Sequence, residues 1–74
     1  MKYTLYWWDT DDEGGYGICP SDEIRLDAKL IGHFNTVSEL GALLYADDPE
    51  WFFDEPGADM FAMEMMRSYK EREV

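Results

Sequence analysis

Positive charge is scarce in this sequence. Six Lys and Arg residues stand against seventeen Asp and Glu residues, which gives a net charge of −11 at pH 7. Proteins bind the phosphate backbone of nucleic acids and the anionic surface of membranes through Lys and Arg side chains. The sequence therefore predicts no direct binding of nucleic acid and no attachment to a membrane. The partners that this charge favours are basic protein surfaces and cations.

Cysteine and histidine are almost absent. Cys19 is the single cysteine, which excludes an internal disulfide and a zinc site made of cysteines alone. Nothing in the spacing of Cys19 and His33, the single histidine, places the two as a thiol–imidazole pair. The glycines at 14–17 lack the lysine and the following helix of a phosphate-binding loop. We therefore expect a protein that is not an enzyme and holds no cofactor.

Long apolar segments are missing too. No stretch approaches the ~20 consecutive apolar residues that cross a membrane, and no apolar run of a signal peptide follows Met1–Thr4. These absences predict a protein of the reducing cytoplasm. The 74 residues are 46% hydrophobic and 16% aromatic. We expect them to fold as one acidic domain, residues 1–74, whose thin core is built from large side chains.

The hydrophobic pattern in the N-terminal half predicts two strands. Residues 2–8 alternate as a strand that carries aromatic side chains on both faces. Residues 23–34 alternate as a second, half-buried strand, in which Gly32 marks a bulge. Residues 10–22, rich in glycine and acids, are expected to form a long loop between the two strands.

Two helices are predicted in the C-terminal half. Thr36-Val37-Ser38-Glu39 is a capping box, so the first helix should run from Val37 to about Ala46, with Glu39 reaching back to Thr36. The second should run from Ala58 to about Arg72. Its helical period places one set of side chains on the core side: Ala58, Phe61, Ala62, Met65, Met66 and Tyr69. Met60 and Met63 fall on the opposite side.

The segment between the helices, residues 50–54, has two interpretations. Asp48 before Pro49 favours a short helical turn, whereas Trp51-Phe52-Phe53 is also typical of a short strand. The expected fold is α+β: a small antiparallel sheet of two to three strands packed with two helices, in the order β-β-α-(turn or strand)-α. Because two strands alone are marginal, we expect a third from the Trp51 segment or residues 16–19, or a homodimer that completes the sheet.

The negative charge is unevenly distributed along the chain. Residues 9–59 hold fourteen acids and two bases, whereas residues 60–74 hold three of each. Two dense clusters lie in expected loops, where side chains project into solvent, and each has aromatic neighbours. The residues predicted to bind a partner are Asp9, Asp11, Asp12, Glu13, Trp8 and Tyr16 in the first cluster, and Asp47, Asp48, Glu50, Asp54, Glu55 and Trp51 in the second.

The first cluster also begins like a calcium-binding loop. Asp9, Asp11 and Gly14 match the first, third and sixth positions of an EF-hand. The twelfth position, which requires a bidentate Glu, is Pro20, and the preceding segment is predicted to be a strand rather than a helix. We therefore expect no specific metal site.

In size, charge and lack of a catalytic motif, the chain resembles the small acidic inhibitors of phages and mobile elements, the anti-CRISPR and antirestriction proteins. The resemblance is one of composition over the whole chain, without a shared family motif. It implies a nucleic-acid mimic in the host-cell cytoplasm, whose carboxylates occupy the basic nucleic-acid-binding site of a target protein.

The alternative is a small adaptor or assembly subunit. Such a protein would bind through Met60 and Met63 or through the aromatic first strand, and its acidity would only maintain solubility.

Overall fold

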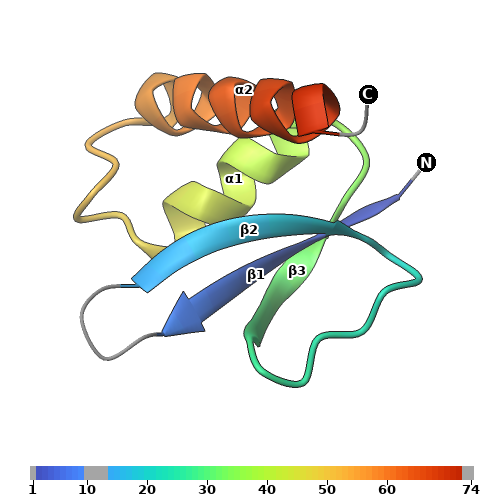
Figure 1. Ribbon diagram of the computed structural model, residues 1–74. Helices are drawn as coiled ribbons and strands as arrows, with labels where there is room; N and C mark the ends of the chain where they lie inside the picture. The colour runs from blue at the N-terminus through green and yellow to red at the C-terminus, as the bar shows by residue number, and fades with distance from the viewer. Residues whose placement is uncertain (1, 10–13, 73–74) are drawn as a thin grey trace.

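The computed structural model, which describes residues 2–9 and 14–72, contains a three-stranded antiparallel sheet and two helices (Figure 1). In chain order the elements are β1 (Tyr3–Asp9), β2 (Gly14–Pro20), β3 (Lys29–Phe34), α1 (Val37–Asp47) and α2 (Glu55–Arg72). β1 is the central strand of the order β2-β1-β3, and both helices lie on one side of the sheet. The predicted α+β class is confirmed.

The third strand comes from within the expected loop. Residues 14–20 form β2, which pairs with β1 over seven residues. The strand predicted as an alternative at residues 16–19 is therefore confirmed, and the expectation of a loop over 10–22 is wrong for residues 14–20. Glycine normally weakens a strand, but at two positions of β2 the rings of tryptophan side chains on β1 leave no room for a larger residue. A Cβ atom on Gly14 would clash with the ring of Trp7, and one on Gly17 with the ring of Trp8. Each indole therefore takes the space that a side chain of β2 would fill.

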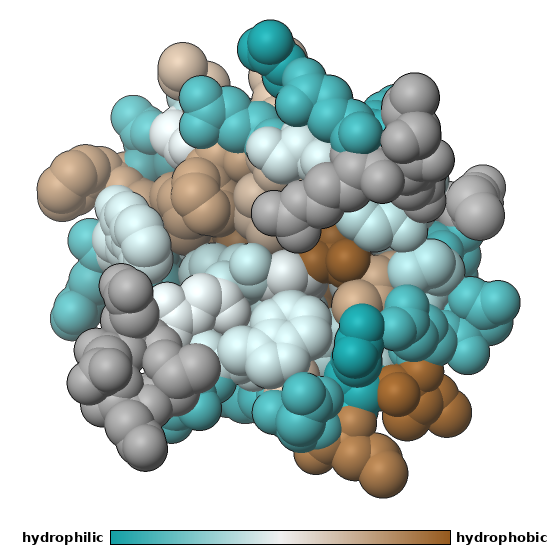
Figure 2. Space-filling model, in the orientation of Figure 1, coloured by the Kyte–Doolittle hydropathy of each residue, from teal (hydrophilic) through white to brown (hydrophobic). Residues whose placement is uncertain are grey.

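The predicted second strand is too long. β3 begins only at Lys29, because β1 pairs with it no further than Trp7 opposite Lys29. Residues before Lys29 form a loop instead, and Ile24 and Leu26, expected to be half-buried, are 79% and 95% exposed. Hydrophobic side chains accordingly gather at the lower right of the molecule, over the connection from β2 to β3 (Figure 2).

The bulge predicted at Gly32 is confirmed. Gly32 pairs with Leu5 and Leu30 pairs with Tyr6, so Ile31 between them has no partner on β1. The extra residue shifts the alternation of β3, and Ile31 packs against the same core as Phe34.

Both helices form where the sequence predicts them. Thr36 Oγ1 accepts the Glu39 N–H bond at 3.2 Å, while Glu39 Oε2 accepts from the Asn35 N–H at 2.8 Å, one residue earlier than the expected Thr36. α2 begins at Glu55, three residues before the predicted start, because Asp54 Oδ1 accepts the Gly57 N–H bond at 2.8 Å and caps the first turn.

The connection between the helices is a turn rather than a strand. The Phe52 N–H donates to the Asp48 carbonyl at 3.2 Å, which closes one helical turn as the first interpretation expected. This turn drives the Phe52 ring into the core, while Phe53 stays exposed.

The core lies between the helices and the sheet. Its buried members are Leu5, Phe34, Leu40, Leu44, Phe52, Ala58, Ala62 and Met66. The predicted inner face of α2 is therefore confirmed, and Met60 and Met63 are exposed, as expected. On the far side of the sheet, Thr4, Tyr6 and Cys19 are also buried.

Helices α1 and α2 pack closely at Gly41. A Cβ atom there would clash with the Asp59 carboxylate and lie 3.2 Å from the Asp59 Cα atom. The Cα atom belongs to the backbone, so it moves only if α2 moves. Glycine is therefore a packing requirement at this position, although it weakens an isolated helix.

Replacing Gly41 with Ala should lower the free energy of unfolding by up to about 2 kcal/mol, because an overpacking cost of about 1–3 kcal/mol is only partly offset by a gain of about 1 kcal/mol in helix propensity. Urea denaturation measures the difference. Gly15→Ala is the matched control, since its Cβ atom meets nothing within 4 Å. It should leave the stability unchanged or slightly raised. A Gly41→Ala variant as stable as the parent would contradict the close approach.

Candidate acidic binding surface

A hydrogen bond connects β2, the strand that follows the first acidic cluster in the sequence, to the second cluster. The Tyr16 hydroxyl on β2 donates to Asp47 Oδ2, at the end of α1, with a distance of 2.7 Å. The Trp7 ring of β1 packs edge-on against Tyr16, with 4.8 Å between ring centroids. Asp9, which is exposed, is the last residue of β1. The end of β1, the end of α1 and the connection to α2 consequently lie at the same end of the molecule (Figure 1).

Aromatic contacts continue from this point to the second cluster. The centroids of Tyr16 and Phe61 are 6.5 Å apart, and those of Phe61 and Phe52 are 5.5 Å apart. Trp51 stacks on Phe52 at 5.7 Å and is itself about half exposed. We call Trp7, Tyr16, Phe61, Phe52 and Trp51 the aromatic row. It extends through packed rings from the end of β1 to the turn between the helices.

A shallow hollow of about 220 Å³ lies where the sheet meets α1. It is lined by Trp7, Tyr16, Lys29, Ile31, Asp47 and Asp48. Lys29 was not among the predicted site residues, and it places one positive charge beside the two carboxylates. Its position follows from pairing with Trp7 across the sheet, which the sequence alone did not reveal.

Two of the predicted acids also stabilise the local backbone. Asp48 Oδ1 accepts the Trp51 N–H bond at 3.3 Å, and Asp54 caps α2. These bonds orient both carboxylates on the surface. Glu50 and Glu55 are exposed beside them. We call Asp9, Asp47, Asp48, Glu50, Asp54 and Glu55 the acidic end.

Asp47 and Asp48 occupy an electrostatically unfavourable place. They lie at the C-terminal end of α1, where the helix dipole carries partial negative charge and cations are normally preferred. The last turn of α1 contains no basic residue. The dipole and the two carboxylates therefore concentrate negative potential at one point of the surface.

Trp8 lies apart from the acidic end. It points to the opposite face of the sheet from Trp7, where its ring packs over Gly17 and lies 5.7 Å from that of Tyr6. Side chains alternate between the two faces of a strand, so Trp7 lies on the same face as Leu5, towards the helices. This alternation was the signal that Trp7, rather than Trp8, belongs to the site. Asp11, Asp12 and Glu13, and with them the EF-hand-like spacing, lie outside the described residues.

The residues considered for catalysis are kept apart by the central strand. Cys19 and His33 both pair with Thr4, one from each side, which separates them by two strand spacings, about 10 Å. His33 Nδ1 lies 2.8 Å from Thr4 Oγ1 instead. Within residues 2–9 and 14–72, no three His, Cys, Asp or Glu side chains are grouped to hold a metal ion.

Comparisons with known proteins found no similar protein: no family model, no curated protein and no solved structure matches this chain. Among the described helices, none has the length and apolar character needed to cross a membrane.

The Tyr16–Asp47 contact has a consequence for pH dependence. Partial burial raises the pKa of the Tyr16 phenol, and the hydrogen bond to Asp47 and the charges of Asp47 and Asp48 raise it further. An unfolded tyrosine ionises near pH 10. Above about that pH the unfolded chain loses this proton while the folded chain retains it, so stability should fall as the pH rises.

Urea denaturation of the parent and of Tyr16→Phe, at about pH 8 and about pH 11, tests this expectation. The free energy of unfolding of the parent should fall relative to the variant at the higher pH. Lysine ionisation is common to both proteins and cancels in the comparison. A difference that does not change with pH would show that Tyr16 titrates normally.

Proposed function

We propose that this protein is a non-enzymatic inhibitor whose acidic end occupies a basic, nucleic-acid-binding site on a target protein. The hydrogen bond from Tyr16 to Asp47 is the observation that carries the proposal. It ties β2 to the end of α1, so that Asp9, which ends β1, and the acids of residues 47–55 lie at the same end of the molecule. The target class follows from charge complementarity, since Arg and Lys line the sites that bind phosphates.

The orientation of the carboxylates supports this proposal. Asp47 is held by Tyr16, while Asp48 and Asp54 are held by backbone N–H groups. Side chains that are already ordered lose little conformational entropy on binding. A surface of fixed carboxylates thus presents charge in a defined arrangement, as a nucleic-acid backbone does with its phosphates.

Exposed aromatic surface provides the remaining contact energy. Trp51 is about half exposed beside Glu50, and residues of this type commonly contribute most of the binding energy at interfaces. The high net negative charge would accelerate association with a basic target by electrostatic steering. Carboxylates at the C-terminal end of α1 are unfavourable because of the helix dipole, and negative charge elsewhere on the surface would serve solubility equally well.

A second candidate function rests on a different surface. Met60 and Met63 are 70% and 60% exposed on the outer side of α2, and Met63 borders a hollow with Val37 and Met66. Exposed methionines adapt well to apolar partners. An adaptor or assembly subunit that binds through this face would use apolar contacts, which salt does not screen.

The triple variant Asp48→Asn, Glu50→Gln, Asp54→Asn tests the acidic end. Asn caps turns and helices as Asp does, so the fold should persist. Asp22→Asn, Asp27→Asn, Glu71→Gln is the matched control, because it changes the net charge equally at exposed positions elsewhere. Each protein is used to capture partners from extracts of the cells that encode it, at low and high salt.

The parent and the control should retain a nucleic-acid-binding protein at low salt and release it at high salt, since screening weakens exposed ion pairs. The acidic-end variant should bind it roughly tenfold more weakly, which corresponds to about 1.4 kcal/mol. Duplex DNA should compete for the captured protein. If the captured protein stays bound at high salt, the adaptor function is favoured. If both triple variants lose the same affinity for it, the binding depends on net charge rather than on the acidic end.

A further inference from the structure

The two edges of the sheet differ in their protection against pairing with another strand. Edge strands commonly carry charged residues or bulges that discourage such pairing. β3 has both, Lys29 and the bulge at Ile31. β2 has neither, because residues 14–20 contain no charged side chain and their register with β1 is unbroken. Only Pro20, at its end, interrupts its hydrogen-bonding capacity.

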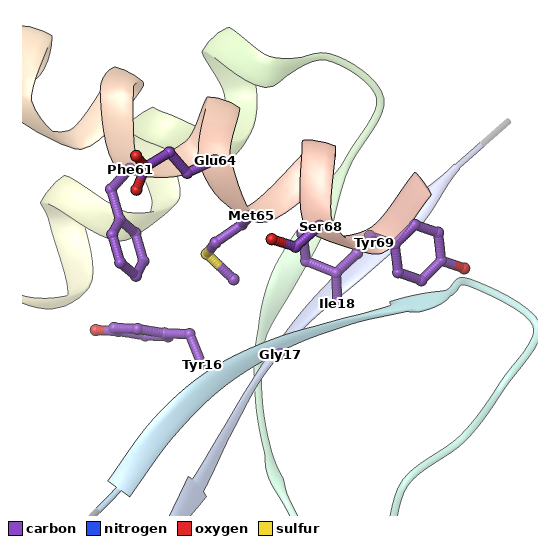
Figure 3. A pocket seen from close by; sticks show the side chains of 8 residues that line it. All are labelled: Tyr16, Gly17, Ile18, Phe61, Glu64, Met65, Ser68 and Tyr69. Atoms are coloured by element: carbon purple, nitrogen blue, oxygen red, sulfur yellow. The ribbon is translucent and has the colours of Figure 1, made fainter. Parts of the chain in front are cut away.

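A groove runs beside this unprotected edge. Helix α2 passes over β2 and leaves a space of about 270 Å³, into which side chains of both elements point (Figure 3). The groove is lined by Tyr16, Gly17 and Ile18 from β2, and by Phe61, Glu64, Met65, Ser68 and Tyr69 from α2. Its walls combine aromatic and apolar side chains with polar groups, namely the Glu64 carboxylate and the hydroxyl groups of Ser68 and the two tyrosines.

A strand added to β2 would extend along this groove. Successive side chains of a strand point to opposite faces, so every second side chain of the added strand would face α2. Tyr16 and Ile18 already point that way, towards Phe61 and Met65 (Figure 3). The backbone of the added strand would pair with the outer N–H and C=O groups of β2, and its alternate apolar side chains would fill the groove.

We propose that β2 binds an extended segment of a partner protein as a fourth strand, and that this segment alternates apolar residues with Lys or Arg. Charge complementarity selects this occupant. The apolar side chains of the segment face α2, so its Lys or Arg side chains lie on the opposite face and are attracted by the net charge of −11 on the whole chain rather than by Glu64 in the groove. A second copy of the chain would bring the same negative charge against it. The inference goes beyond the acidic end, because its contacts are backbone hydrogen bonds and apolar side chains.

The probe for this site is a synthetic, end-capped octapeptide that alternates Val and Lys. Titration into the 15N-labelled protein should shift amide resonances in β2 and in residues 61–69 of α2. The same peptide methylated on every backbone nitrogen has identical side chains but donates no backbone hydrogen bond to β2, and should bind roughly tenfold more weakly or not at all. A Val–Glu octapeptide should be weakened similarly by repulsion.

Ser68→Trp fills the groove from an exposed position and should weaken peptide binding roughly tenfold. Ser38→Trp, at an exposed position on α1, is the matched control and should bind as the parent does. The amide spectrum of each variant shows whether it is folded. The N-methylated peptide tests the same point on the parent protein, independently of any substitution.

Three results would overturn the proposal. The N-methylated peptide binds as well as the parent peptide; the shifted resonances are confined to residues 47–55; or sedimentation shows that two copies of the chain pair through β2 and exclude the peptide. The variant Asp48→Asn, Glu50→Gln, Asp54→Asn separates this site from the acidic end. It should retain the peptide at β2 even if the proposed inhibitory function fails.

Discussion

The central strand β1 has to be covered on both faces, and the remaining structure follows from this requirement. Leu5 faces the helices and is buried by them, whereas Thr4 and Tyr6 face the opposite side and are buried as well. That second face has no helix over it among the described residues. The loop after β2 covers it instead: the Tyr6 hydroxyl donates to the Glu23 carbonyl and accepts the Arg25 N–H bond. Ile24 and Leu26 remain in solvent because the backbone of their segment, rather than its apolar side chains, covers the sheet.

Elements specified by neighbouring residues were predictable, and elements specified by distant ones were not. The capping box at Thr36 and the helical period of residues 58–69 are local patterns, and both helices formed as expected. Residues 16–19 were one of two candidate segments for a third strand, and the sequence did not decide between them, because the glycines of β2 are explained only by indole rings on another strand. The strand predicted at residues 23–28 is wrong for a related reason. A strand needs a neighbouring strand to pair with, and β1 pairs with β3 only as far as Lys29.

The same distinction applies to the acidic end. The sequence locates both clusters and their aromatic neighbours, and strand alternation separates Trp7 from Trp8. It does not reveal that Tyr16 contacts Asp47, since this bond joins residues 31 positions apart and depends on the path of the chain. Tyr16 lines both the hollow beside Asp47 and the groove beside β2. The two proposed surfaces are therefore contiguous at Tyr16.

Cys19, the only thiol of the chain, is buried on β2 opposite Thr4. A thiol reagent reaches such a group only when the strand or the loop over it opens, so the labelling rate measures the free energy of that opening. Because Cys19 lies on an edge strand, this labelling rate measures local opening at the edge of the sheet rather than opening of the helices. The scarcity of cysteine, which excludes a disulfide, thus provides the protein with a single intrinsic reporter of local unfolding, at the strand where a partner would add.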